Sequence, residues 1–113
     1  MLNQVVLVGR LSRDLEIVES DGKKQATLEL AVPRNFKNEN GEYDTDYITC
    51  ILWNSIAENT AEYCKKGDIV GVKGRLQTES LEKEDGSKVF LTRIMAEKVT
   101  FLSSRKPEDE EEC

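Results

Sequence analysis

Three Asx-Gly dipeptides, each flanked by stretches rich in β-forming residues, restrict this chain to a fold built from β-hairpins. They are Asp21-Gly22, Asn40-Gly41 and Asp85-Gly86. Such dipeptides favour tight turns between antiparallel strands, because Gly, Asn and Asp tolerate the positive φ angles that these turns require. The sequence therefore predicts three hairpins.

The stretches around these turns have the composition and alternation of strands. In the second, Ala26 to Val32, aliphatic side chains occupy one face, and Pro33 is expected to end it because proline cannot donate to a ladder. In the first stretch, residues 3–11, Gly9 indicates a bulge or a close approach of another backbone segment. The expected strands are 3–11, 26–32, 43–53, 69–76 continuing through 76–83, and 88–94 continuing through 93–102.

One segment has helical periodicity instead. Ser55 and Glu58 have the spacing of a capping box, in which each side chain binds the other residue's backbone N–H. Apolar residues follow at helical spacing, and Lys65 and Lys66 suit the negative C-terminal end of a helix. Gly67 suits the left-handed position beyond it. We expect one short helix of about three turns.

This order of elements predicts an all-β protein, a five-stranded OB-fold barrel with one short helix between strands 3 and 4 and long protruding hairpins. The length of 113 residues fits one small domain, assigned to residues 1–103. Residues 107–113 carry five acidic residues and no basic one, so 104–113 is expected to be a short disordered acidic tail. The tail supplies most of the net charge of −6, which leaves the domain nearly neutral.

Composition argues against several classes of protein. The chain has no His and no Gly-rich phosphate loop, so we expect no enzyme, no metal site and no cofactor. The longest apolar run, Val5–Val8, is too short for a membrane span, and the N-terminus shows no secretory signal. Three cysteines without metal-like spacing favour a reduced, cytoplasmic protein.

Aromatic residues favour a binding function. Tyr47 and Trp53 are six residues apart, so they share one face of a strand whose other face can supply the core. Phe36 lies in a polar stretch beside Arg34 and Lys37. Exposed rings next to cations suit unpaired nucleotide bases and their phosphates. The same pattern fits rings that fill a barrel or a subunit interface, and both interpretations remain open at this point.

The sequence closely resembles the bacterial and phage single-stranded DNA-binding proteins, and most of all those of low-GC Gram-positive bacteria. The resemblance runs through LNQVVLVGRLSRD, LELAVPRNF, DYITCILWN, AENTAEYCKKG, VGVKGRLQT and AEKVTFL. It implies an OB-fold subunit of a homotetramer that binds single-stranded DNA without sequence preference in replication, repair, recombination or DNA uptake. A cytoplasmic, nucleoid-associated location follows from it.

The resemblance also implies site residues. The family's stacking rings fall on Phe36, Tyr47 and Trp53. Its phosphate-binding cations are represented by basic residues of the loops and strands, namely Arg10, Arg34, Lys37, Lys66, Lys73 and Arg75.

Several positions depart from the family pattern. Leu81 stands where a ring is expected, Glu79 where a basic residue is common, and Val18-Glu19 where Arg-Tyr is common. The acidic tail lacks the apolar tip that recruits replication and repair proteins, which puts those partners in doubt. We therefore expect weaker, more salt-sensitive DNA binding than is typical. The alternative is an OB-fold interaction or assembly module with weak or lost DNA binding.

Overall fold

The computed structural model describes residues 1–102 and places six strands and one helix in that range. The strands are β1 (Val5–Leu11), β2 (Ile17–Ser20), β3 (Lys23–Lys37), β4 (Tyr43–Trp53), β5 (Ile69–Glu82) and β6 (Lys88–Phe101). Helix α1 (Asn54–Tyr63) lies between β4 and β5. No helix in this part of the chain is long and apolar enough to cross a membrane. The predicted acidic tail, 104–113, lies outside the described residues.

The strands form one sheet in the order β1-β5-β6-β4-β3-β2, and β1 also pairs with β3. The pairings are antiparallel except for β4 with β6. The β1–β3 contact is short, with Arg10 opposite Ala31 and Leu11 opposite Leu30. The β4–β6 contact is equally short, with Cys50 opposite Ile94 and Ile51 opposite Met95. The mostly β fold with one short helix is consistent with the predicted OB fold, but the sheet curls through these short contacts without closing the predicted barrel.

The prediction of five strands was wrong because it had no strand before the Asp21-Gly22 turn. β2 fills that place and pairs with β3 from Ile17 opposite Ala26 to Ser20 opposite Lys23. All four of its residues are exposed, so it has none of the apolar alternation by which a half-buried strand is recognised. Asp21 and Gly22 have φ angles of 52° and 77°, which confirms the predicted turn.

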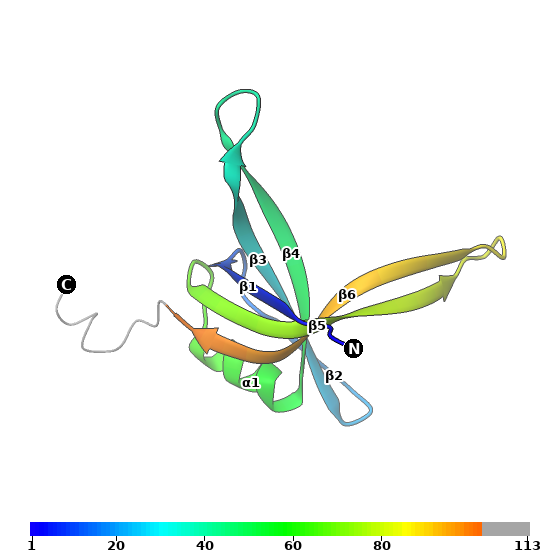
Figure 1. The fold of residues 1–113 in the computed structure, drawn as a ribbon. Coiled ribbons are helices and arrows are strands. Elements are labelled where there is room, and N and C mark those ends of the chain that lie inside the picture. The colour runs from blue at the N-terminus through cyan, green and yellow to red at the C-terminus, as the bar shows by residue number, and fades with distance from the viewer. Residues whose placement is uncertain (103–113) are drawn as a thin grey trace.

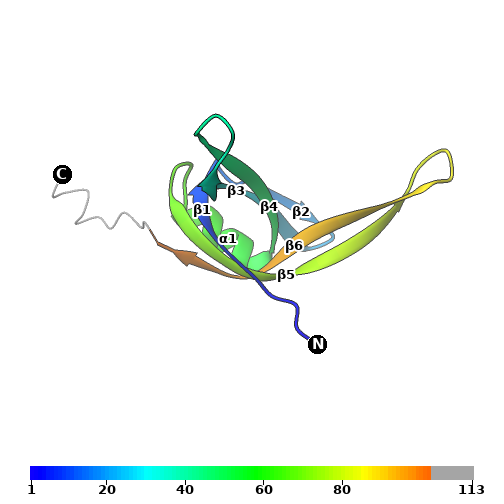
Figure 2. The ribbon, with the colours of Figure 1, turned by 45° about the horizontal axis from the view of Figure 1, so that its top comes forward.

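Two hairpins extend beyond the body of the sheet as long arms that diverge from each other (Figure 1). One consists of β3 and β4 and turns at Gly41, and the other consists of β5 and β6 and turns at Gly86. Both glycines have positive φ, 79° and 88°, which confirms the other two predicted turns. Figure 2 shows the same divergence from a second direction.

β3 does not end at Pro33, contrary to the prediction. Pro33 still lies opposite Thr45 of β4, and the register becomes irregular only between Pro33 and Lys37. Both residues are exposed. Proline has no backbone N–H to donate, and the irregular register after Pro33 lets the strand continue without that hydrogen bond. The strand therefore continues to Lys37 and carries Phe36 far out on its arm.

The core lies inside the curved sheet. Aliphatic side chains of β1, β3, β4 and β5 fill it, and Ala57 and Thr60 of α1 close it on one side. Cys50 and Cys64 are buried. A Cβ on Gly9 would lie 2.8 Å from the Ala31 carbonyl oxygen, which confirms the close backbone approach predicted there. The largest fully buried apolar side chains are Leu11, Leu28, Leu30, Leu52, Val70 and Val72.

The helix occupies the predicted place but does not use the predicted capping box. It begins at Asn54, after an N-cap at Trp53 that makes no side-chain capping hydrogen bond. The Glu58 carboxylate instead accepts from Lys24 Nζ at 2.7 Å, and Asn54 Oδ1 accepts from the Lys24 backbone N–H at 3.1 Å. The last turn also holds no basic residue, since the helix ends before Lys65. Gly67 has the expected positive φ, 98°.

Candidate nucleic-acid interface

Tyr47 and Trp53 project from the outer face of β4, opposite the face on which Cys50 and Leu52 enter the core. Tyr47 is 65% exposed and Trp53 is 38% exposed, so neither ring fills the interior of this chain. Thr49 and Ile51 lie between them on the same face. Because residues advance by about 3.4 Å along an antiparallel strand, the two ring positions are about 20 Å apart.

Phe36 lies on a different part of the molecule from Trp53. It is 64% exposed, near the end of the β3–β4 arm. Lys37 lies opposite Tyr43 at the same end, with its Nζ 5.9 Å from the centre of the Tyr43 ring. The arm thus presents a ring and a cation together, as the sequence predicted, but not beside Trp53.

Trp53 lies in a row that crosses three strands. It is opposite Gln25 of β3, which is opposite Val18 of β2. These three residues and Lys23 help to line a shallow hollow beside the β2–β3 turn. The Trp53 indole therefore lies on the surface of the sheet, and Lys23 supplies a cation at the edge of the same hollow.

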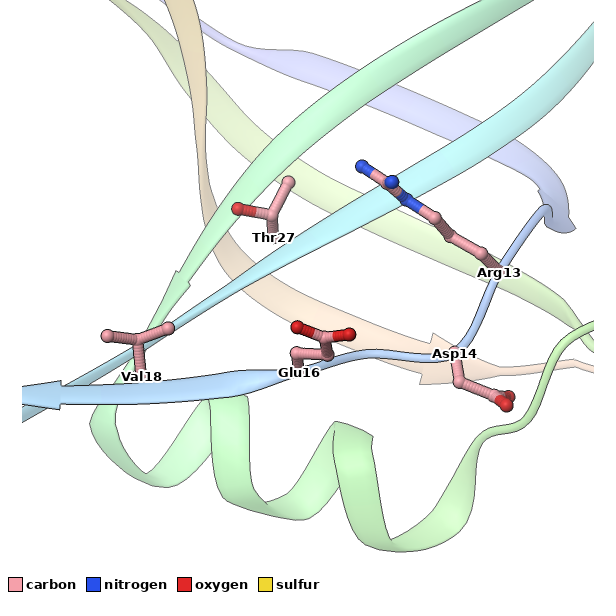
Figure 3. Close-up of a pocket in the computed structure, with 5 residues that line it drawn as sticks. All are labelled: Arg13, Asp14, Glu16, Val18 and Thr27. Atoms are coloured by element: carbon pink, nitrogen blue, oxygen red, sulfur yellow. The ribbon is translucent and has the colours of Figure 1, made fainter.

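A second hollow begins at Val18 and continues to Thr27 (Figure 3). Arg13 extends its guanidinium across β3, and the Glu16 side chain also faces the hollow. Asp14 points away, and its carboxylate accepts the Lys66 backbone N–H at 2.7 Å. Arg13 was missed from the sequence, because nothing in the pattern of residues 12–16 shows that its side chain lies in one hollow with Thr27 of β3.

A third hollow lies where the two arms diverge. Thr27, Thr49 and Ile51 line it from β3 and β4, and Leu91, Thr92 and Arg93 line it from β6. It shares Thr27 with the second hollow, as the first two share Val18. We use the name outer groove for these three neighbouring hollows, whose linings extend from Trp53 past Val18 and Thr27 to Arg93. Its lining combines a ring, hydroxyl groups and charges of both signs.

Arg34 is held by carboxylates. Its Nη2 lies 2.9 Å from Asp46 Oδ1, and its Nη1 lies 3.8 Å from Asp44 Oδ2. The hydrogen bond to Asp46 and that carboxylate's charge raise the pKa of Arg34. The same hydrogen bond lowers the pKa of Asp46 below its usual value of 3.8. A phosphate at Arg34 has to compete with two carboxylates that are already in place.

The other predicted cations are spread over several surfaces. Arg10 donates to the Gly67 carbonyl oxygen at 2.8 Å and lines a separate hollow with Pro33 and Thr45. Arg75 donates to Gln77 Oε1 at 2.8 Å, and its Nε lies 3.8 Å from Glu97 Oε2. None of the six predicted cations is among the residues that line the outer groove. The remaining members of that set, Lys66 and Lys73, are exposed on the loop after α1 and on β5.

The positions that depart from the family pattern lie on or near the outer groove. Val18 lines it, and Leu81 is 46% exposed farther out on the β5–β6 arm. Glu79 pairs with Arg93, with Oε1 3.8 Å from Nε. Phe90, on β6 opposite Ser80, is 72% exposed and was not singled out from the sequence. Its exposure in the folded structure shows that this ring faces outward.

Comparisons with known proteins agree on one family. The model of the single-strand binding protein family matches residues 2–102. Single-stranded DNA-binding protein B of Bacillus subtilis is 49% identical over 109 residues, which cover 96% of each chain. The single-stranded DNA-binding protein of Halalkalibacterium halodurans is 50% identical over 106 residues. Those residues cover 93% of this chain but 63% of that relative, so this chain spans less than two thirds of its length.

Proposed function

This chain belongs to the single-strand binding protein family, and we propose on that basis that it binds single-stranded DNA without sequence preference. The observation that carries the proposal is the placement of Tyr47 and Trp53. Both rings are exposed on one face of β4, and the outer groove occupies the sheet surface next to them. The proposed stacking residues are Phe36, Tyr47 and Trp53.

Exposed rings fit unpaired bases and not a duplex. Every base has a π-face, so stacking is tolerant of sequence and contributes about 1–3 kcal/mol per base. In a duplex the bases stack on one another, and the rings on β4 have no face to contact. Coating of this kind would protect exposed strands in replication, repair, recombination or DNA uptake, without catalysis and in a cytoplasmic, nucleoid-associated setting.

Cations supply the second component of binding. Neutralising each phosphate on a single strand releases counterions and adds about −0.7 to the slope of log affinity against log salt. The proposed phosphate contacts remain the predicted set, Arg10, Arg34, Lys37, Lys66, Lys73 and Arg75. The carboxylates beside Arg34 compete with phosphate, so binding should be weaker than in a family member without them.

Self-association belongs to the same proposal. Val6 and Val8 of β1 are 65% and 52% exposed, and they lie opposite Lys73 and Gly71 of β5. A strand face that exposes two valines next to a glycine is suited to packing against another subunit. We propose a homotetramer that uses this face. Light scattering should give the mass of four chains, and Val8→Asp should shift it to a smaller species.

A binding experiment tests the central proposal. Fluorescence anisotropy of labelled oligo(dT) at low salt should show saturable binding. A mixed-sequence single strand should compete equally well, and the matching duplex should compete poorly. Equal competition by the duplex would contradict the proposal.

The second candidate is an assembly module that has kept the fold and lost strong DNA binding. Glu16 on the outer groove and Glu79 beside Arg93 favour it, because carboxylates there repel phosphates. This candidate predicts an oligomer of normal mass that leaves the anisotropy of oligo(dT) unchanged at low salt.

A further inference from the structure

We propose that Arg93 of β6 binds phosphates of single-stranded DNA, in the segment of the DNA that lies between the rings of Tyr47 and Trp53. This inference rests on the proposed function and adds a contact that lies outside the six cations predicted from the sequence. The observation behind it is the third hollow of the outer groove, in which Arg93 faces Thr49 and Ile51 of β4.

The two rings leave an interval that a bound strand has to cross. They are about 20 Å apart along β4, so one base cannot contact both. Thr49 and Ile51 are the outward residues within that interval, and both line the hollow that contains Arg93. A DNA strand stacked on both rings would therefore pass through this hollow, where its sugar–phosphate backbone would meet the guanidinium of Arg93.

The lining of the hollow suits a sugar–phosphate backbone. It has a volume of about 360 Å³, and the hydroxyl groups of Thr27, Thr49 and Thr92 are available as donors. Hydroxyl groups and arginine are common partners of phosphate oxygens. Ile51 is 5% exposed, so this side chain of the hollow is held in place by packing.

Glu79 explains how Arg93 is positioned before DNA arrives. The two side chains come from paired strands, with Glu79 Oε1 3.8 Å from Arg93 Nε, and both are about one third exposed. At this distance the contact is an ion pair without a short hydrogen bond, so the guanidinium retains donors for phosphate. The cation that position 79 lacks in this chain is thus supplied from the neighbouring strand.

The test compares three variants with the wild-type protein in oligo(dT) titrations over a range of salt concentrations. Arg93→Gln should weaken binding about tenfold at low salt and make the salt slope shallower by about 0.7. Arg93→Lys should keep most of the slope, because the charge remains. Lys24→Gln is the matched control, since it also removes an ion-paired cation but one that contacts Glu58 of α1. It should bind like the wild type.

The outcomes separate this inference from the proposed function. If the wild type binds and a normally folded Arg93→Gln protein has the same affinity and slope, Arg93 is not a phosphate contact. If the wild type does not bind, the proposed function itself fails. Should Arg93→Gln fail to fold, Thr49→Glu decides, because it places a carboxylate in the same hollow. Weaker binding of that variant supports the inference, and unchanged binding overturns it.

Discussion

The guanidinium of Arg34 is bound to the carboxylate of Asp46 through two nitrogens. Nη2 lies 2.9 Å from Oδ1, and Nε lies 3.2 Å from each carboxylate oxygen. Two-nitrogen contacts of this kind are the stronger form of the arginine–carboxylate pair. Asp46 therefore already binds the guanidinium that the proposed function assigns to a DNA phosphate.

The Asp46→Asn substitution should release Arg34 for phosphate. We expect tighter binding of oligo(dT) at low salt and a salt slope steeper by up to about 0.7, because one more phosphate becomes neutralised. Titration at several salt concentrations measures both quantities. Arg34→Ala should then make the slope shallower by less than about 0.7 in the wild-type background, where Asp46 competes with phosphate, and by about 0.7 in the Asp46→Asn background. Equal effects of Arg34→Ala in both backgrounds would contradict this account.

Acid should weaken the contribution of Asp46 to folding. The hydrogen bond from Arg34 and the guanidinium charge hold the pKa of Asp46 below 3.8, the value expected in the unfolded chain. The stabilisation is thus complete above pH 3.8 and is lost as the pH falls through the folded-state pKa. Urea unfolding of the wild type and Asp46→Asn across this range should show stabilities that converge at low pH. A constant difference between them would argue against the pair.

The two described cysteines should resist thiol reagents in the native protein. Burial raises the pKa of both Cys50 and Cys64 to about 11, and Asp68 adds to the effect at Cys64. The reactive thiolate is therefore scarce at neutral pH, and both side chains are almost inaccessible. Peptide mass spectrometry after alkylation should find both unmodified in the folded protein and modified in urea. Rapid native labelling of Cys50 would contradict the burial described here.

Gly74 and Gly71 of β5 form a matched pair for a stability test. A Cβ on Gly74 would overlap the backbone carbonyl of Met95 beside the irregularity in the β5–β6 register, whereas a Cβ on Gly71 would lie 3.4 Å from the Leu102 side chain. We expect Gly74→Ala to lower the free energy of unfolding by about 1–3 kcal/mol. Gly71→Ala should change it much less. Similar losses in urea unfolding would show that the backbone clash is not the cause.

The local features of the fold were predictable because neighbouring residues determine them. The three turns follow from Asx-Gly dipeptides, and the strand at 43–53 follows from alternation within a single segment. The features that failed depend on distant partners. Glu58 could not be assigned correctly from the helix alone, because Lys24 of another element binds its carboxylate. β2 was missed because every one of its residues is exposed.

The candidate site shows the same division. Alternation along β4 placed Tyr47 and Trp53 on one face, and both are exposed there. The surroundings of the cations depend on how the strands pair, and this pairing brings Arg34 to Asp46 and Arg93 to Glu79. Arg13 and Arg93 reach the outer groove from a loop and from the far arm, so their spacing in the sequence does not reveal it.

Trp53 is the only tryptophan in the chain, so its fluorescence reports on the proposed site without labelling. Titration of the wild-type protein with long oligo(dT), at low and at high salt, tests the central claim most directly. The account predicts strong quenching that saturates at low salt and weakens as salt is added. Unchanged fluorescence together with an unchanged electrophoretic mobility of the DNA at low salt would contradict it.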